Sequence, residues 1–175
     1  MLLEVRGIRS KKREVFAMQK IICFHNPKEA YGFLSNWYMC TFKDGPTTFN
    51  SMEQYMMYRK ALTFNDVYMA ESILKSVNAA NIKEMGRRVA GYKDEVWSAV
   101  RYDVVKRGLY LKFSQNEQLA TQLWGTKDAI LCECAVNDKI WGIGLSMTDP
   151  DRLNMSKWKG ANLLGKALME VRAML

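Results

Sequence analysis

The chain has 175 residues and a formal net charge of +8; 49% of the residues are hydrophobic and 25% are charged. These values are typical of one globular domain with its own core and argue against a disordered or collagen-like chain. No apolar run approaches the ~20 residues of a membrane span, and the N-terminus lacks the apolar segment and cleavage site of a signal peptide. We therefore expect a cytoplasmic protein that does not associate with membranes.

Half of the excess positive charge lies near the N-terminus. Residues 1–20 contain six Lys or Arg and two Glu, a net +4, which leaves +4 of the total +8 for the rest of the chain. We expect residues 1–19 to form a basic, flexible extension and residues 20–175 to form the domain. The mild charge of the domain suits a phosphate-bearing ligand, while the extension leaves a nucleic-acid or localisation role open.

Short strands are expected in the first third of the chain, and helices follow. Apolar patterning and turn residues predict strands over residues 21–24, 39–42 and 47–49, the last two forming a hairpin. Helical spacing of apolar residues predicts helices over residues 51–62, 66–75, 79–89, 94–113, 117–124 and 162–175. The expected N-caps include Asn65, Asn78 and Asn162.

Residues 129–135 alternate and predict one more strand, with Cys132 and Cys134 on one face and Glu133 on the other. Strands and helices do not alternate along the chain, which argues against a doubly wound parallel sheet. The pattern favours an α+β, mostly α-helical fold, a single compact domain with a few short strands.

The chain contains four cysteines and one histidine: Cys23, Cys40, Cys132, Cys134 and His25. Cys132 and Cys134 form a C-x-C pair, which does not match the ligand spacing of structural zinc sites. We expect the cysteines to be small buried hydrophobic residues and expect no metal site. A single histidine also makes a His-based catalytic triad a poor hypothesis.

Glu53 is the first candidate catalytic residue. It lies in the first turn of the helix expected over residues 51–62, where the helix dipole favours an ionised carboxylate. If Asn50 is the N-cap, Glu53 completes a capping box; if Ser51 is the cap, Gln54 takes that role and Glu53 is free. The pattern alone favours the capping role and leaves the other open.

Three further charged residues are candidates. Lys60 lies two turns after Glu53 on the same helix face, where it could pair a phosphate or remain a solvated surface lysine. Glu133 interrupts an apolar strand, a costly position unless the carboxylate is paired or functional. Asp138 fits either a turn role or a pocket role.

The last candidates lie near glycines. Trp141-Gly142-Ile143-Gly144 would let the backbone approach a ligand closely, although it is neither a dinucleotide-binding fingerprint nor a P-loop. Asn162 opens the last helix, whose N–H groups could hold a phosphate or simply be capped. Three loop aromatics would suit base stacking or core packing: Tyr31, Trp37 and Trp158.

Several motifs occur in one order along residues 21–175. They are Tyr31-Gly32-Phe33-Leu34-Ser35-Asn36, Ser51-Met52-Glu53-Gln54-Tyr55 with Lys60-Ala61, Lys83-Glu84-Met85-Gly86-Arg87, Leu111-Lys112-Phe113, Glu133 with Asn137-Asp138 and Trp141-Gly142-Ile143-Gly144, and Trp158-Lys159-Gly160-Ala161-Asn162-Leu163-Leu164-Gly165. In these segments the chain resembles the NADAR superfamily, also called the YbiA-like family. The resemblance implies a mostly α-helical domain with a few short strands.

The resemblance also implies an activity. Known members cleave N-glycosidic bonds: some hydrolyse ribosylaminopyrimidine 5′-phosphates, intermediates of riboflavin synthesis, and others remove ADP-ribose from guanine bases. We therefore expect an N-glycosidase that acts on a phosphorylated N-riboside without cofactor or metal. ADP-ribosylated nucleic acid is the alternative substrate, and a non-catalytic ADP-ribose-binding module is the alternative function.

Residue roles follow from matching the family motifs. Glu53 matches the glutamate of a Ser-x-Glu motif and would stabilise an oxocarbenium-like ribose and orient water. Asp138 is expected to share the catalytic role. The residues expected to bind substrate are Asn36, Lys60, Glu133, Trp141, Gly142 and Asn162.

One position departs from the family. Many members have histidine after the Ser-x-Glu glutamate, where this chain has Gln54. Gln54 can form hydrogen bonds but cannot titrate. If that histidine supplies a proton to the leaving base, the resemblance implies slower catalysis here, which is the feature that keeps the binding-module hypothesis open.

Overall fold

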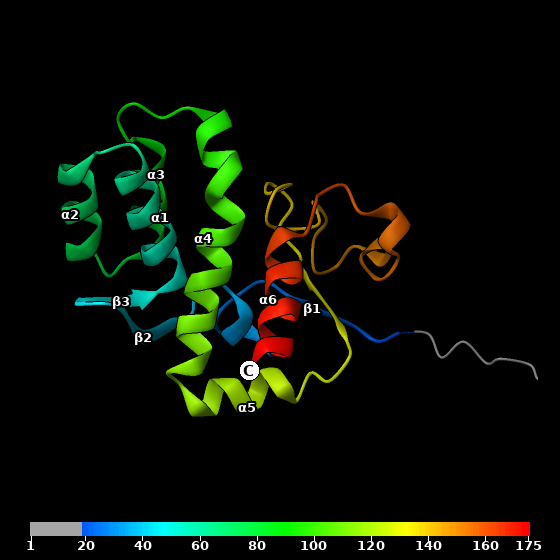
Figure 1. Ribbon diagram of the computed structural model, residues 1–175. Coiled ribbons are helices and arrows are strands. Elements are labelled where there is room, and N and C mark those ends of the chain that lie inside the picture. The colour runs from blue at the N-terminus through cyan, green and yellow to red at the C-terminus, as the bar shows by residue number, and fades with distance from the viewer. Residues whose placement is uncertain (1–18) are drawn as a thin grey trace, which may run out of the picture.

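The computed structural model describes residues 19–175, so the predicted flexible extension lies outside the described residues except for Gln19 (Figure 1). The helices are α1 (Met52–Thr63), α2 (Val67–Lys75), α3 (Ala79–Arg87), α4 (Asp94–Ser114), α5 (Glu117–Trp124) and α6 (Leu163–Met174). The long helix α4 runs through the middle of the domain, with α1, α2 and α3 on one side and α6 on the other (Figure 1). The mostly helical α+β prediction is confirmed. Within residues 19–175, none of the helices has the length and apolarity of a membrane span.

A β-hairpin leads directly into α1. Its strands are β2 (Met39–Asp44) and β3 (Thr47–Ser51), and they pair antiparallel with Phe42 opposite Phe49. Both rings are buried, stack on each other, and contact the ring of Tyr55 on α1. These aromatic contacts hold the hairpin against α1 and so set the position at which the helix begins.

The start of α1 decides between the two roles predicted for Glu53. Ser51 is the N-cap, and its hydroxyl accepts the backbone N–H of Gln54 at 3.2 Å. The Gln54 amide oxygen in turn accepts the backbone N–H of Asn50 at 2.9 Å. The favoured prediction, with Asn50 as cap and Glu53 in a capping box, is therefore wrong, because Ser51 and Gln54 satisfy these donors and leave the Glu53 carboxylate free.

The predicted N-cap of α2 is wrong, whereas that of α3 is confirmed. Asp66, not Asn65, caps α2, and its carboxylate accepts the N–H groups of Met69 and Ala90 at 3.1 and 2.8 Å. Asn65 lies one residue earlier in the left-handed conformation, with φ of 57°. The predicted cap of α3 is confirmed, since the Asn78 side chain accepts a hydrogen bond from the N–H of Asn81.

Strands from distant parts of the chain form the second sheet. β1 (Ile21–Phe24) pairs in parallel with β4 (Ile130–Glu133), placing Cys23 opposite Cys132 and Phe24 opposite Glu133. The predicted alternation in β4 is confirmed, because Leu131 packs into the main core while Cys132 lies in a separate cluster on the other face. The long loop before α6, with two short 3-10 turns, covers that second face.

Asn162 joins α6 to β4. Its side chain is 2% exposed, accepts the N–H of Glu133 at 3.2 Å and donates to the carbonyl of Leu131 at 2.9 Å. It occupies the N-cap position with φ of 52° but makes no side-chain cap bond, so the predicted capping role is wrong. Gly165 permits the close approach, because a Cβ atom there would overlap the Leu131 carbonyl.

Replacing Asn162 with alanine should destabilise the protein. The change leaves the N–H of Glu133 and the carbonyl of Leu131 unpartnered at a buried junction. Alanine is also strained in the left-handed conformation at this position, which asparagine tolerates better. We expect the free energy of unfolding in urea to fall by about 2–4 kcal/mol. The Asn162→Gly variant, which loses the same bonds without that strain, should fall by about 1 kcal/mol less. Unchanged stability of the alanine variant would contradict this role.

Candidate active site

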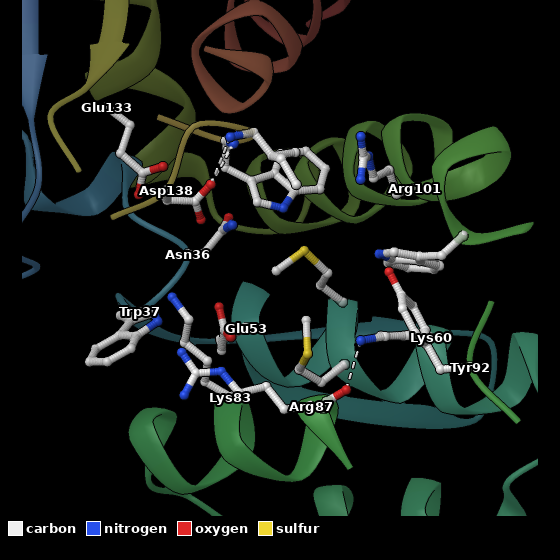
Figure 2. A pocket seen from close by; sticks show the side chains of 16 residues that line it. Asn36, Trp37, Glu53, Lys60, Lys83, Arg87, Tyr92, Arg101, Glu133 and Asp138 are labelled. Atoms are coloured by element: carbon white, nitrogen blue, oxygen red, sulfur yellow. Dashed lines mark hydrogen bonds between the residues drawn. The ribbon is translucent and has the colours of Figure 1, made fainter. Parts of the chain in front are cut away.

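A cavity of about 220 Å³ lies between α1, α3, the start of α4 and the end of β4. The side chains that line it are Asn36, Trp37, Glu53, Met56, Met57, Lys60, Lys83, Gly86, Arg87, Tyr92, Trp97, Arg101, Glu133, Asp138, Ile140 and Trp141. Figure 2 shows the carboxylates and Asn36 toward one end, with Lys60, Tyr92 and Arg101 toward the other. The cavity therefore brings together Asn36, Glu53, Lys60, Glu133, Asp138 and Trp141 from the predicted site.

Glu53 is held at the wall of this cavity by the loop that precedes β2. The backbone N–H of Glu53 donates to the carbonyl of Asn36 at 2.8 Å, which docks the loop on the first turn of α1. Glu53 is 3% exposed and Asn36 is 5% exposed. One carboxylate oxygen of Glu53 and the side-chain oxygen of Asn36 are buried without a hydrogen-bond partner among the described residues. Buried polar atoms are rarely left so, and the pair indicates a place where a ligand or water supplies donors.

Lys112 on α4 fixes the same loop from behind. Its side chain is fully buried, and its ammonium donates to the carbonyls of Phe33 and Ser35 at 2.6 and 3.4 Å. Burial lowers the pKa of Lys112 to about 8. The loop that presents Asn36 is thus anchored from two sides, by α1 and by α4.

Burial shifts the protonation of the two glutamates. Desolvation, together with the nearby Asp138 carboxylate, raises the pKa of Glu53 to about 7 and the pKa of Glu133 to about 8. At neutral pH, Glu53 is divided between its two forms while Glu133 is mainly protonated. One cavity then holds a carboxylate and a carboxylic acid side by side, the pairing that acid–base chemistry requires.

Lys83 and Arg87 bring positive charge to these carboxylates, a role that the sequence analysis did not assign. Lys83 lowers the pKa of both Glu53 and Glu133, and Arg87 lowers that of Glu53. The two basic residues are four apart on α3, so they share a helix face, and this spacing was the available signal. Trp37 lines the cavity beside them, and the ammonium of Lys83 lies 5.8 Å from its ring centroid.

Asp138 combines the two roles that its sequence context suggested. One carboxylate oxygen accepts the N–H groups of Ile140 and Trp141 at 3.0 and 2.8 Å, which closes the turn after β4. Its second oxygen makes no hydrogen bond to a described residue, and Asp138 lines the cavity. The turn therefore orients a carboxylate toward Glu53 and Glu133.

The opposite end of the cavity is basic and aromatic. The ammonium of Lys60 donates to the carbonyl of Gly86 at 2.7 Å and lies 4.1 Å from the ring centroid of Tyr92. Burial lowers the pKa of Lys60. Arg101 adds a second cation near Trp97, so this end can take an anionic or hydroxyl-bearing part of a ligand.

Two predicted binding residues lie outside the cavity lining. A Cβ atom at Gly142 would come within 2.9 Å of the Glu133 carbonyl and 3.0 Å of the Asp138 carbonyl, so this glycine lets the loop pack on β4. The Asn162 side chain is occupied by the backbone of β4. Both residues support the strand that carries Glu133, and the structure shows no surface on them that reaches the cavity.

Gln54 also points away from the cavity. It is 1% exposed, and its amide group donates to the carbonyls of Ile73, Leu74 and Ser76 at the end of α2. The side chain at this position fastens α1 to α2. The exchange of the family histidine for Gln54 therefore removes no titrating group from the cavity lining.

A second cavity of about 540 Å³ adjoins the carboxylates. It shares Trp37, Lys83, Glu133 and Asp138 with the first, and its other lining residues include His25 and Ser35. Glu133 and Asp138 thus lie between two hollows, whereas Glu53 lines only the first.

Replacing Glu53 with glutamine should stabilise the protein at alkaline pH. The carboxyl pKa is near 7 in the fold, against 4.5 as its ordinary value, so the folded state binds the proton more tightly and stability falls as pH rises from about 4.5 to 7. At pH 8, Glu53→Gln should raise the free energy of unfolding by up to about 3 kcal/mol, and at pH 5 by about 1 kcal/mol. Urea unfolding at both pH values measures this.

The exposed Glu71 on α2 provides the matched control, because Glu71→Gln makes the same chemical change at a solvated position. Its effect on stability should be small and nearly independent of pH. A Glu53→Gln variant that behaves like the Glu71→Gln control at pH 8 would contradict the raised pKa.

Comparisons with known proteins identify the family of this chain. The NADAR domain model matches residues 23–175. An N-glycosidase of Acanthamoeba polyphaga mimivirus is 36% identical over 161 residues, which are 87% of this chain and 95% of the viral protein. A riboflavin biosynthesis protein of Vibrio vulnificus is 33% identical over 155 residues, 89% of this chain but 38% of that protein.

A solved structure shows the same fold. The NMR structure of the Escherichia coli protein YbiA aligns with a TM-score of 0.73 at 28% identity, over 97% of this chain and 92% of that chain. Residues 23–175, which match the family model, contain α1 to α6 and all the residues that line the cavity. By its sequence, its fold and the extent of both matches, this chain belongs to the NADAR domain family.

Proposed function

We propose that this protein is an N-glycosidase that hydrolyses the C1′–N bond of a phosphorylated N-riboside. The observation that carries the proposal is the buried Glu53 carboxylate. One of its oxygens, like the side-chain oxygen of buried Asn36, has no hydrogen-bond partner among residues 19–175. The ionised Glu53 carboxylate shares its cavity with the mainly protonated carboxyl group of Glu133. This combination suits a reaction that develops positive charge on a sugar. Relatives named N-glycosidase support the same activity.

Cleavage of an N-glycosidic bond passes through an oxocarbenium-like ribose, with positive charge shared between C1′ and the ring oxygen. Ionised Glu53 stabilises this charge, since a fixed carboxylate in a water-poor cavity acts more strongly than one in solvent. Its oxygen also accepts a hydrogen bond from the water that attacks C1′. Asp138, at the same end of the cavity as Glu53 and Glu133, takes the proton that this water releases.

Glu133 is the proposed general acid. Its pKa of about 8 keeps it protonated at neutral pH, and it lies where the two cavities meet. It donates its proton to the leaving nitrogen as the C1′–N bond breaks, and water supplies the hydroxyl group that C1′ gains. The products are the free amine or base and the ribose phosphate. This assignment needs no histidine, which fits the position of Gln54 away from the cavity.

The substrate is expected to be anionic. Four basic side chains line the cavity: Lys60, Lys83, Arg87 and Arg101. They face three carboxyl groups, of which that of Glu133 is mainly protonated at neutral pH. A ribosylaminopyrimidine 5′-phosphate is the first candidate, supported by the relative named a riboflavin biosynthesis protein. The adjoining 540 Å³ cavity favours a second candidate with more bulk on both sides of the bond, an ADP-ribosylated guanine in nucleic acid.

Glu53→Gln should abolish turnover of whichever substrate is correct. Two assays in parallel identify it: release of ribose 5-phosphate from a ribosylaminopyrimidine 5′-phosphate, and release of ADP-ribose from guanine-ADP-ribosylated DNA. We expect turnover in one assay to fall at least about 100-fold in Glu53→Gln, because the charge that stabilises the cation is lost. Ligand affinity should change little, and Glu71→Gln should match the wild type.

Retained activity in Glu53→Gln, or an equal loss of affinity and turnover, would contradict the catalytic role of Glu53. Failure of the wild type in both assays, with measurable binding of ADP-ribose, would favour the binding module over the enzyme.

The pH dependence of the reaction tests the acid and base assignments. Activity should rise as Glu53 ionises near pH 7 and fall as Glu133 loses its proton near pH 8, which gives a narrow bell. Glu133→Gln should remove the alkaline limb and lower the rate by about 100-fold or more. A Glu133→Gln profile that keeps both limbs would show that another group supplies the proton.

A further inference from the structure

Three cysteines gather on the face of the β1–β4 pair that points away from the catalytic cavity. The sulfur atoms of Cys23, Cys132 and Cys134 all lie within 4.8 Å of one another, and the Cys23–Cys132 pair is 3.4 Å apart. Cys132 and Cys134 are buried, whereas Cys23 is partly exposed. The sequence offered only a C-x-C pair; strand pairing adds the third thiol from 109 residues away.

The three sulfurs form a hydrogen-bonded cluster. The Cys132 thiol donates a hydrogen bond to the sulfur of Cys23. Three sulfurs that lie this close to one another can give up their thiol protons and bind one cation together.

The ligand set points to a soft cation of low coordination number. Within the described residues, no histidine or carboxylate joins the three sulfurs in the cluster. Zinc in structural sites takes four ligands, so three thiolates alone leave it incomplete. Monovalent copper prefers thiolate and thioether ligands, and the thioether-bearing Met147 packs against this cluster.

A path to the cluster exists from the surface. An open hollow is lined in part by Cys134 and Met147, and it extends to Lys83, Arg87 and Asp138 at the rim of the catalytic cavity. The half-exposed Cys23 offers a first point of contact for an incoming ion. The apolar residues Ile143 and Leu145 close the rest of the cluster from solvent.

We propose that Cys23, Cys132 and Cys134 form a binding site for monovalent copper. The ion binds as Cu(I) to three thiolates, each thiol that becomes a ligand releases its proton to solvent, and copper does not change its oxidation state. The site lies behind the strand that carries Glu133, since Cys132 and Cys134 flank that residue on the opposite face. A bound ion would link β1 to β4 at the position from which the strand presents its carboxyl group to the cavity.

Competition with a chromogenic Cu(I) chelator tests the site in the full chain, kept reduced and free of oxygen. We expect one Cu(I) per chain, and X-ray absorption should show three sulfur neighbours. Cys23→Ser should weaken binding by at least about 100-fold, the upper range seen when supporting residues of metal sites are lost. Cys40→Ser is the matched control, because Cys40 lies on the distant hairpin beside Lys112, and it should bind like the wild type.

Equal Cu(I) affinity in Cys23→Ser and the wild type would overturn the proposal, as would two-sulfur coordination or tighter binding of Zn²⁺ in a four-ligand site. A Cys23–Cys132 disulfide formed in place of copper binding would also overturn it. Circular dichroism checks that Cys23→Ser is folded, and Cys134→Ser, with the same expected loss, replaces it if it is not. Copper binding is measured without substrate. A negative result would therefore overturn the copper site without bearing on the proposed hydrolase activity.

Discussion

The parallel pairing of β1 with β4 is the constraint on which the rest of this domain depends. The two strands are separated by residues 25–129, which contain α1 to α5, so the pairing closes the helical part of the chain into one body. Because successive strand residues face opposite sides, the same four-residue β4 sends Glu133 to the cavity and Cys132 to the cluster behind it. Asn162 and Gly165 then lock α6 against this strand, so the position of Glu133 is determined by contacts far from it in sequence.

The buried carboxyl groups of the cavity destabilise the folded state, and packing elsewhere in the domain must offset this cost. Two buried glutamates and Asp138 repel one another, and burial disfavours their charged forms. The aromatic contacts of Phe42, Phe49 and Tyr55 hold α1 in place despite this. The arrangement is the familiar exchange of stability for activity, in which groups that would be more stable apart are kept together because their altered acidity is useful.

Much of the local structure was predictable because it depends on neighbouring residues. Helix and strand positions follow apolar spacing and turn chemistry, and most predicted boundaries lie within two residues of those observed. Errors arose where two adjacent side chains compete for one role, as with Asn65 and Asp66, or Asn50 and Ser51. In each pair the backbone conformation decides which side chain reaches the open N–H groups, and the surrounding packing sets that conformation.

The candidate site residues also divide into those that the sequence predicts and those that only the tertiary structure reveals. The sequence by itself determined the class of fold, the helical start that holds Glu53, and a set of polar residues in motif order. Only the tertiary structure decided that Lys83 and Arg87 balance the carboxylates, that Gln54 and Asn162 bond backbone instead of lining the cavity, and that Cys23 meets Cys132. The physical reason is that charge, burial and unpartnered oxygens are properties of atoms brought together across long stretches of chain, and spacing along the chain does not encode which atoms those are.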